Sequence, residues 1–228
     1  MNKLIVIPAR GGSKGIPHKN IHPLNGKPLL CYTLELLLAA ELTETDIAVS
    51  TDSADIKALA LSFGQVDVVD RPEEISGDRA STEAALLHAI DVMEQKKGKK
   101  YQAVLTLQPT SPLRKKETLK AFIEAFEKNY PQYDALLSLN ESRSDYWIQT
   151  EDGNYERLYK DAPRRRQERK PLYVENSAYY MTDVKALRET CSVLGTHANG
   201  FIIDETEAVD INEPVDLVIA GGLLVGTL

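Results

Sequence analysis

The sequence predicts an α/β protein whose mainly parallel β-sheet is covered by helices on both faces. Three observations predict this fold class. Short apolar runs alternate with longer amphipathic stretches over residues 4–139. The short runs are continuously apolar, which is typical of parallel strands that are buried on both faces. The two patterns follow each other as strand, helix, strand, helix, which is the order from which doubly covered parallel sheets are built.

The elements can be assigned in chain order. We predict strands at the short apolar runs, which are residues 4–9, 47–51, 66–69, 103–109 and 135–139. We predict helices at the amphipathic stretches, which are residues 28–42, 53–64, 81–97 and 115–129. Ser53 can cap the start of the second helix and Gly64 can end it, while Ser81 and Thr82 can cap the third.

The pattern changes after residue 140. Residues 145–159 carry a Gly-Asn turn between aromatic stretches, which indicates a β-hairpin. Residues 160–171 are polar and basic and have no period, so we expect a loop there.

Regular elements return towards the C-terminus. Residues 172–183 have the composition of a strand, and residues 214–226 have a helical pattern that the pair Gly221–Gly222 weakens. We therefore expect a single domain over residues 1–228, with an insertion at about 140–182 that forms a lobe or a dimer arm.

The composition limits the functions that we expect. The net charge is −7, with 27 lysine and arginine residues against 34 aspartate and glutamate residues, so no nucleic-acid partner is expected. Cys31 and Cys191 are far apart, which predicts neither a zinc site nor a disulfide framework. The N-terminal apolar run is too short for a signal peptide, and no run approaches the roughly 20 residues that cross a bilayer. We therefore expect a cytoplasmic protein that does not bind membranes.

The first predicted strand runs into a glycine-rich, cationic segment, IPARGGSKGIPHKNI at residues 7–21. Glycines let backbone N–H groups approach an anion closely, and Ser13 adds a hydroxyl donor. Arg10, Lys14 and Lys19 gather the positive charge that a nucleoside triphosphate requires. The glycines have neither Walker nor Rossmann spacing. A flexible turn with solvated charges is the alternative that this segment alone leaves open.

Further polar clusters follow the later predicted strands. Thr51–Asp52 follow the second strand, Arg71 follows the third, and residues 108–114 follow the fourth. Ligands of open α/β sheets bind outside the carboxyl ends of the strands. These clusters and the first loop are therefore expected to meet at one site.

Together these motifs resemble the acylneuraminate cytidylyltransferase family, which includes the CMP-N-acetylneuraminic acid synthetases and related CMP-nonulosonate synthetases. Besides the first loop, the matching motifs are STDS at 50–53, RPEEISGDRAST at 71–82, LQPTSPLR at 107–114, RRQ at 165–167, ENSAYYM at 175–181 and VDINEPVDL at 209–217. They fall in the family's order and cover nearly the whole chain. The resemblance implies a three-layer, Rossmann-like nucleotidyltransferase fold with a small inserted dimerisation lobe. It also implies a homodimer that joins CTP to an acidic nine-carbon 2-keto sugar and releases pyrophosphate.

The resemblance also implies roles for individual residues. Arg10, Lys19 and Asp210 would be catalytic. The two cations would stabilise the charge on departing pyrophosphate, and Asp210 would hold the magnesium ion. The nucleotide would be bound by Arg10, Gly11, Gly12, Ser13, Lys14, Lys19, Asn20, Arg71, Ala80, Ser81, Thr82 and Gln108. The sugar would be contacted by Gln108, Arg166, Gln167 and Tyr180, in part from the partner subunit.

Magnesium is the cofactor that the resemblance implies. In the family, two aspartates of the VDINEPVDL stretch hold Mg²⁺, and here these positions are Asp210 and Asn212. An asparagine oxygen can coordinate the ion but brings no negative charge. The number of ions is therefore left open. Asp216 is expected in the first turn of a helix, where a carboxylate is favourable to the helix dipole.

Two further departures from the family pattern leave the sugar open. Tyr146 and Trp147 stand where sialic acid enzymes often have a basic residue, and Arg143 is the nearest cation. Ser177 stands where a glycine usually follows the asparagine. N-acetylneuraminate, deaminated nonulosonate, legionaminate and pseudaminate all stay open as substrates. A transferase for another sugar or nucleotide, and a nucleotide-binding protein without turnover, are the alternative functions.

Overall fold

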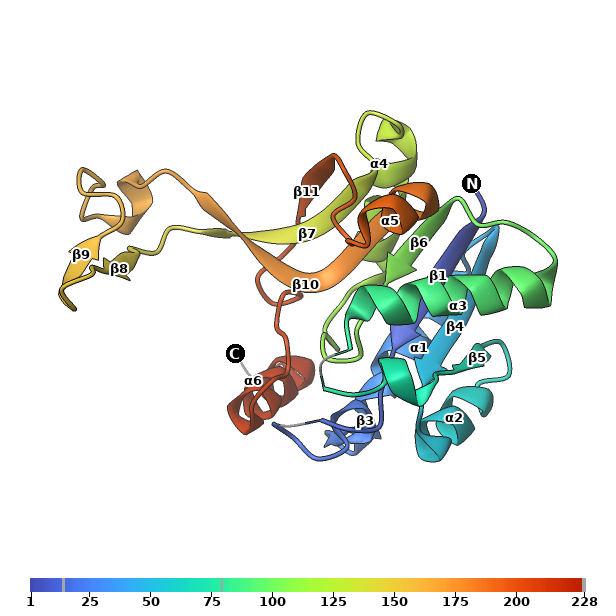
Figure 1. Cartoon of the computed structure of the whole chain (residues 1–228). Coiled ribbons are helices and arrows are strands. Elements are labelled where there is room, and N and C mark those ends of the chain that lie inside the picture. The colour runs from blue at the N-terminus through green and yellow to red at the C-terminus, as the bar shows by residue number, and fades with distance from the viewer. Residues whose placement is uncertain (14, 79, 227–228) are drawn as a thin grey trace.

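The computed structural model describes residues 1–13, 15–78 and 80–226, and one sheet runs through its centre (Figure 1). Seven strands form this sheet within the described residues: β1 (Lys3–Pro8), β4 (Thr45–Thr51), β5 (Asp67–Asp70), β6 (Ala103–Thr106), β7 (Ala135–Ser142), β10 (Leu172–Asp183) and β11 (Ala198–Ile202). Their spatial order is β11-β7-β10-β6-β1-β4-β5. β10 is antiparallel to both of its neighbours, and the other pairs are parallel. The predicted mainly parallel sheet is confirmed.

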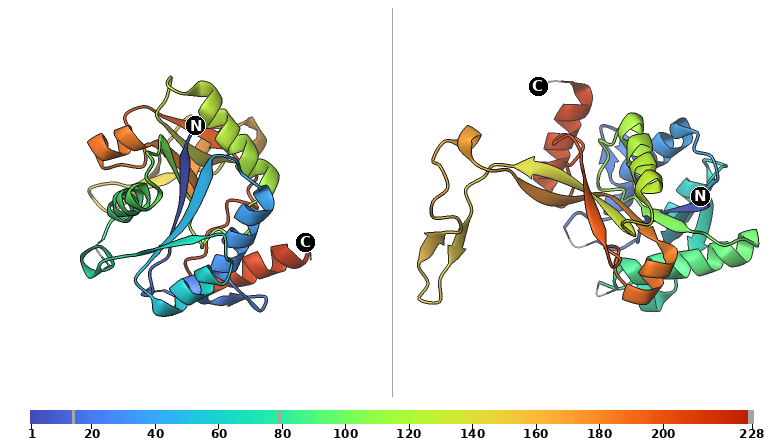
Figure 2. Two further views of the ribbon diagram at one scale, coloured as in Figure 1. Left: turned by 90° about the vertical axis from the view of Figure 1, so that its right-hand side faces the viewer. Right: turned by 90° about the horizontal axis from the view of Figure 1, so that it is seen from above.

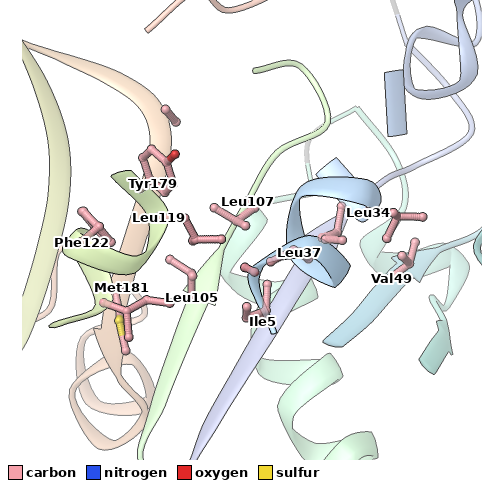
Figure 3. Packing of buried hydrophobic residues seen from close by; sticks show 14 of the residues in the cluster. Ile5, Leu34, Leu37, Val49, Leu105, Leu107, Leu119, Phe122, Tyr179 and Met181 are labelled. Carbon is pink, nitrogen blue, oxygen red and sulfur yellow. The ribbon is translucent and has the colours of Figure 1, made fainter. Parts of the chain in front are cut away.

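Helices cover both faces of the sheet. They are α1 (Leu29–Ala40), α2 (Ala54–Leu61), α3 (Thr82–Lys97), α4 (Lys116–Asn129), α5 (Val184–Thr190) and α6 (Pro214–Val225). Ile5 and Ile7 of β1 point to one face, where they pack in a cluster with α1, α2 and α4 (Figure 3). Leu4 and Val6 point to the other face and pack with α3 and α5. Every second residue of the strand thus feeds a different core, which is why the strand is apolar throughout.

The strands and helices predicted up to residue 139 are present, with ends that shift by a few residues. Ser53 accepts a hydrogen bond from the Ile56 N–H at 3.5 Å, and Ser81 accepts one from the Ala84 N–H at 3.1 Å, so both predicted caps are confirmed. Within the described residues, the structure adds seven elements to those predicted. They are the paired strands β2 (Pro23–Leu24) and β3 (Lys27–Pro28), the helix α5, the edge strand β11, and the 3₁₀ turns at Lys19–Ile21, Glu73–Ile75 and Arg166–Glu168.

An arm projects from the body of the molecule (Figure 2). β7 and β10 run out together beyond the other strands and lead to the hairpin of β8 (Trp147–Gln149) and β9 (Tyr155–Arg157). The predicted hairpin and the turn at Gly153, where φ is 84°, are present. The arm is shorter than the predicted insertion of 140–182, because Tyr180–Asp183 pair with β6 in the central sheet.

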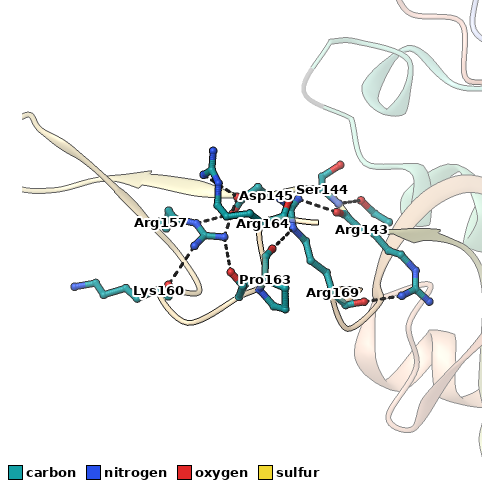
Figure 4. A network of polar contacts seen from close by, with 10 residues as sticks. Arg143, Ser144, Asp145, Arg157, Lys160, Pro163, Arg164 and Arg169 are labelled. Atoms are coloured by element: carbon teal, nitrogen blue, oxygen red, sulfur yellow. Dashed lines mark hydrogen bonds and ion pairs between the residues drawn. The ribbon is translucent and has the colours of Figure 1, made fainter. Parts of the chain in front are cut away.

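A carboxylate at the centre of an arginine cluster holds the tip of the arm (Figure 4). Asp145 accepts two hydrogen bonds from Arg157, at 3.1 and 2.9 Å, and pairs with Arg169 at 3.3 Å. Arg143 donates to the Arg169 carbonyl at 2.6 Å. The hydrogen bonds from Arg157 and the nearby guanidinium charges lower the pKa of Asp145. These contacts fix the basic loop in which Arg166 lies.

Among the described residues, none of the helices combines the length and the apolar character that crossing a membrane requires.

Candidate active site

A cavity of about 530 Å³ opens at the carboxyl ends of β1 and β6. Ligand sites in proteins commonly have this size, and open α/β sheets bind ligands at this edge. The wall residues are Pro8, Arg10, Gly12, Ser13, Gly15, Lys19, Asn20, Arg71, Asp78, Ala80, Ser81, Thr82, Gln108, Pro109, Thr110, Asn212 and Glu213. The first loop, Arg71 and the residues at 108–110, which were predicted to meet after separate strands, therefore do meet. Thr51 and Asp52 are not in the wall, but Asp52 accepts from the Gly11 N–H of the first loop.

The glycine-rich loop is held by its own polar groups. The Asn20 amide donates to the Arg10 carbonyl at 2.9 Å, and the Gly11 N–H donates to Asp52 at 2.7 Å. The Ser13 hydroxyl accepts from the Lys19 N–H at 3.2 Å and donates to the Ile16 carbonyl. The hydroxyl of Ser13 is thus committed to the loop in this state, and binding of a phosphate by it would require this bond to open.

Three cations face the cavity from different elements. Arg10 pairs with Asp78 at 2.9 Å. Lys19 donates to the Ile211 carbonyl at 2.9 Å and to the Asn212 side-chain oxygen at 3.1 Å. Arg71 donates to the backbone and hydroxyl oxygens of Ser50, at 2.8 and 3.1 Å.

Arg71 is partly buried at the cavity wall. Burial lowers the pKa of its guanidinium, and the charge of Asp52 partly offsets this effect. Its Nε and one Nη are used by Ser50, so its other Nη group is the one that can face a ligand. A guanidinium presented in this way suits an acceptor such as a nucleobase carbonyl.

The helix α3 begins at the cavity wall. Ala80, Ser81 and Thr82 line the cavity, and Ser81 caps the helix as well. The N-terminus of a helix carries free N–H groups and a partial positive charge, which favour anionic or electron-rich ligands.

Arg114 is a buried guanidinium that ties together three parts of the site. It donates to the Ala178 carbonyl of β10 at 2.9 Å, to the Thr33 hydroxyl of α1 at 3.1 Å, and to the Gln108 carbonyl. It lies over the ring of Tyr179, 5.7 Å from the ring centre. Burial lowers the pKa of Arg114 to about 10, so it stays charged at neutral pH. Arg114 therefore fixes the loop that carries Gln108 to β10 and α1.

An acidic segment forms the opposite wall. Its main chain is anchored where the Ile211 N–H donates to the Thr110 carbonyl at 2.8 Å. The Asn212 amide donates to Asp210 Oδ2 at 2.7 Å. Asp210 Oδ1 is buried and has no hydrogen-bond partner among the described residues. A buried carboxylate oxygen without a hydrogen-bond partner fits a cation ligand.

Glu207 fixes this segment to the helix α4. Its side chain is 2% exposed, and it accepts from the Lys115 N–H and the Thr118 hydroxyl, both at 2.8 Å. Asp216 fixes the C-terminal end of the segment, because its carboxylate accepts from the N–H groups of Asn212 and Glu213, both at 2.8 Å. Asp216 thus caps α6, as its predicted position in the first turn indicates.

The structure brings most of the predicted site residues together and leaves some apart. Lys14 lies outside the described residues. Gly11 and Asp210 are not part of the cavity wall: Gly11 donates to Asp52, and Asp210 accepts from the amide of Asn212, which is in the wall. Tyr180 lies in β10, and Arg166 and Gln167 lie on the arm, so none of the three lines the cavity of its own chain. The predicted residues in the wall are Arg10, Gly12, Ser13, Lys19, Asn20, Arg71, Ala80, Ser81, Thr82, Gln108 and Asn212.

Three acidic residues that the structure places at the site were not predicted from the sequence. Asp78 pairs with Arg10, Glu207 anchors the acidic segment, and Glu213 lines the cavity. Asp78 and Glu213 lie within the motifs at 71–82 and 209–217, which are the signals that pointed near them. Asp52, which was predicted to belong to the site, supports the glycine-rich loop.

A doubly covered α/β sheet whose carboxyl edge joins a glycine-rich cationic loop to an acidic segment is the architecture of a nucleotidyltransferase. Two solved structures have this fold. One is CMP:2-keto-3-deoxy-manno-octonic acid synthetase complexed with CTP, which matches with a TM-score of 0.65 at 16% identity over 100% of both chains. The other is 4-diphosphocytidyl-2C-methyl-D-erythritol synthase of Anaerococcus prevotii, which matches with a TM-score of 0.69 at 16% identity over 98% of this chain and 96% of the other. The chain belongs to the cytidylyltransferase family, whose model matches residues 4–210. The predicted family and fold class are confirmed.

Three curated relatives match almost the whole chain. Pseudaminic acid cytidylyltransferase of Campylobacter jejuni is 33% identical over 96% of this chain and 95% of its own length. CMP-N,N'-diacetyllegionaminic acid synthase of Legionella pneumophila is 31% identical over 98% of this chain and 97% of its own length. N-acylneuraminate cytidylyltransferase of Escherichia coli is 30% identical over 95% of this chain, which corresponds to 51% of that relative.

Proposed function

We propose that the protein joins CTP to a nine-carbon 2-keto sugar acid and releases pyrophosphate. One observation carries this proposal: Arg10 and Lys19 face the same cavity as Asn212, whose amide donates to the carboxylate of Asp210. A triphosphate and a cation-bound acceptor can thus share one site. The pseudaminic, legionaminic and neuraminic acid enzymes named above act on such sugars, which supports the sugar class. Because CTP would be the donor, we assign the reaction to the cytoplasm.

The chain's own residues would act mainly by holding and neutralising the triphosphate. The anomeric hydroxyl of the sugar attacks the α-phosphorus of CTP, and the bond from that phosphorus to the bridging oxygen of the pyrophosphate breaks. Arg10, Lys19 and the loop N–H groups would stabilise the negative charge that grows on the departing pyrophosphate. Arg10 would exchange Asp78 for phosphate when CTP binds, because both acceptors reach the same guanidinium.

The nucleoside would lie between Arg71 and the start of α3. The free Nη group of Arg71 is suited to the O2 and N3 acceptors of cytosine. Ala80, Ser81 and Thr82 would contact the ribose from the helix N-terminus, with Gln108 at the boundary between nucleotide and sugar.

Asp210 fits a role as a magnesium ligand through its unpartnered Oδ1. Mg²⁺ commonly takes one or two carboxylates and completes its shell with substrate phosphates and water. When bound, it would neutralise phosphate charge. Asn212 already uses its amide nitrogen on Asp210 and its oxygen on Lys19, so we assign it to positioning Asp210 as well as to the ion.

The variant Asn212→Asp tests this assignment. A second carboxylate beside Asp210 should strengthen cation binding, so the Mg²⁺ concentration for half-maximal rate should fall several-fold. Direct titration of Mg²⁺ into the protein with CTP gives a readout that does not depend on turnover. An unchanged requirement would remove position 212 from the ligand set.

The arm is proposed to complete the site of a second copy in a homodimer. Arg166 and Gln167 are exposed and are carried away from the body of their own chain (Figure 1). Trp147 and Tyr155 on the same arm are 54% and 67% exposed, which is typical of aromatic side chains that enter an interface. An arginine supplied by the partner would suit the sugar carboxylate, since the guanidinium fork pairs with both of its oxygens.

The test is pyrophosphate release from CTP and Mg²⁺ with a panel of sugar acids. The panel holds pseudaminic, N,N'-diacetyllegionaminic, N-acetylneuraminic and deaminated nonulosonic acids, with an eight-carbon 2-keto acid as the control. UTP and ATP replace CTP in parallel reactions. We expect release with CTP and one nine-carbon acid, and pseudaminic acid is the first to test. Tight CTP binding with no release for any acid would favour the non-catalytic alternative.

A further inference from the structure

The side-chain amide of Asn212 contacts charged groups at both of its ends. Its nitrogen donates to Asp210 Oδ2 at 2.7 Å, and its oxygen accepts from the Lys19 ammonium at 3.1 Å. A carboxylate can only accept and an ammonium can only donate, so these two contacts fix the direction of the amide. Asn212 therefore connects a residue proposed to bind phosphate with a residue proposed to bind the metal ion.

The Lys19 ammonium is held by two uncharged oxygens. Besides the Asn212 side chain, it contacts the Ile211 carbonyl at 2.9 Å, so two neighbouring oxygens of the acidic segment share one positive charge. Carbonyl and amide oxygens are also ligands of hard metal ions. A metal ion and an ammonium on the same amide oxygen would repel each other at this short distance. Lys19 and an ion ligated by Asn212 are therefore alternatives.

The backbone of Lys19 is anchored, whereas its ammonium can move. The Lys19 N–H donates to the Ser13 hydroxyl at 3.2 Å, and the next residue, buried Asn20, donates to the Arg10 carbonyl at 2.9 Å. A flexible four-carbon stem separates the ammonium from this backbone, and the side chain lines the cavity. A phosphate is charged and the present acceptors are neutral, so a bound triphosphate would draw the ammonium away from the acidic segment.

Departure of the ammonium would leave oxygens of two neighbouring side chains without a donor. Asp210 Oδ1 is buried and has no hydrogen-bond partner among the described residues. Asn212 Oδ1 would lose the contact with Lys19. Oxygens of this kind are favourable beside a metal ion and unfavourable alone. The movement that binds the triphosphate would thus complete the set of ligands for the ion.

We propose that Lys19 occupies the metal position at Asn212 until a triphosphate binds, so that the nucleotide opens the site for the ion. This inference rests on the proposed function and gives its ligands an order, with the triphosphate first. It also gives a reason for an asparagine at position 212. An aspartate would hold Lys19 as an ion pair, whereas the neutral amide releases it to the phosphate.

The affinity for CTP in the absence of metal tests the contact between Lys19 and Asn212. Calorimetric titration in EDTA, with no sugar acid present, measures binding without turnover. Asn212→Ala removes one acceptor of Lys19 and should tighten CTP binding about three- to tenfold. Asn212→Asp should weaken it about threefold, because Lys19 is then held by a charged partner. Asn129→Ala, at the end of α4, is the matched control and should leave the affinity unchanged.

A Lys19→Met background shows whether these changes act through the lysine. Lys19→Met itself weakens CTP binding, but Asn212→Ala should give no further gain once the ammonium is absent. An equal gain from Asn212→Ala in both backgrounds would mean that position 212 acts on CTP without Lys19, and it would overturn the proposal. No gain in the presence of Lys19 would overturn it as well.

Binding of Mn²⁺ to the nucleotide-free protein is a second measurement, and it decides the matter even where Lys19→Met binds CTP too weakly to detect. Free Mn²⁺ is followed by its electron paramagnetic resonance signal. Lys19→Met should raise the Mn²⁺ affinity about three- to tenfold, and Asn212→Ala should remove this gain. Lys27→Met is the control, because Lys27 pairs with Glu35 and is not in the cavity wall. A gain that persists without Asn212 would be a general effect of charge and would overturn the proposal.

Failure of the proposed function has a different signature. Absence of pyrophosphate release with every sugar acid would overturn the proposed reaction, whereas the binding results in EDTA and with Mn²⁺ would stand. A wild-type protein that binds no CTP under either condition would overturn both the proposed function and the role given to Lys19.

Discussion

At the scale of single residues, two glycines of the same loop have different surroundings. A Cβ atom on Gly15 would stand 2.6 Å from the Asn212 carbonyl oxygen, whereas one on Gly12 would meet nothing within 4 Å. Gly15 is therefore the glycine that lets the cationic loop lie against the acidic segment. Its absent side chain matters for a close approach of two backbones, which no loop composition reveals by itself.

We expect Gly15→Ala to push the loop away from the acidic segment. A displacement of this size, between the groups that hold the triphosphate and Asp210, should lower kcat/KM by about 10²-fold and raise the Mg²⁺ requirement. Gly12→Ala is the control for folding and should leave the free energy of unfolding unchanged. Steady-state kinetics with a Mg²⁺ titration decide the matter, and equal kinetics for Gly15→Ala and wild type would contradict the role given to Gly15.

Arg114 is the residue on which the site's internal order depends most. Its guanidinium satisfies three acceptors from three elements, and a lysine has neither the planar fork nor the number of N–H groups to replace it. Arg114→Lys should lower the free energy of unfolding by about 2–4 kcal/mol, because buried acceptors lose their partners. Arg165→Lys is the control, since Arg165 is exposed and pairs with the exposed Glu168, so the change in stability should be less than about 1 kcal/mol. Urea denaturation of both variants compares them, and similar losses would show that Arg114 is not special.

At the scale of elements, the helix α6 contains two adjacent glycines, Gly221 and Gly222, whose surroundings differ. Gly222 has open space around it, whereas a Cβ on Gly221 would lie 3.0 Å from Asn25 Oδ1, and Asn25 donates to the Gly221 carbonyl at 2.9 Å. Gly222→Ala should raise the free energy of unfolding by about 0.5–1 kcal/mol through helix propensity alone. Gly221→Ala should give no such gain, because Asn25 has to move. Thermal unfolding of the two variants is the measurement, and an equal gain would mean that Asn25 yields without cost.

The elements that the sequence predicted well are those buried on both faces or strongly periodic. β1 is apolar throughout because Ile5 and Leu4 enter different cores. A continuous apolar run of this kind can be recognised in the sequence alone. β11 was missed because it is an exposed edge strand, ANGFI, with no apolar run. The antiparallel direction of β10 was also beyond the sequence, since direction depends on the long arm between β7 and β10 and not on local residues.

The candidate site could also be predicted only in part, because the sequence shows local signals and not contacts between distant residues. Cations and glycines gathered in one loop are a local signal, so Arg10 and Lys19 could be selected from their neighbours in the chain. Glu207 could not be selected, because its role comes from the α4 backbone, which lies about ninety residues earlier. The burial of Glu207 is set by the fold, and no residue next to it in the sequence distinguishes it from the other glutamates of an acidic chain.

At the scale of the whole molecule, the arm is the feature from which we predict a contact with a second chain. The arginine cluster around Asp145 gives the arm tip a defined shape, yet the aromatic residues on it stay exposed. A shaped, apolar and basic projection that covers nothing in its own chain is expected to cover another. In a twofold dimer each arm would reach the other chain's cavity, so every site would be built from two chains.

This arrangement predicts that two inactive variants restore each other. Lys19→Ala removes a cation from the cavity, and Arg166→Ala removes one from the arm, so each homodimer should be nearly inactive. In a mixed dimer, one site receives Lys19 from one chain and Arg166 from the other. Random mixing of equal amounts should therefore recover about a quarter of the wild-type rate, since half of the dimers are mixed and each has one intact site of two. The mixture of Lys19→Ala with Arg10→Ala is the control and should stay inactive, because both residues belong to the same chain's cavity. Recovery in neither mixture, from chains shown to exchange by light scattering and tag capture, would mean that Arg166 serves its own chain or no site at all.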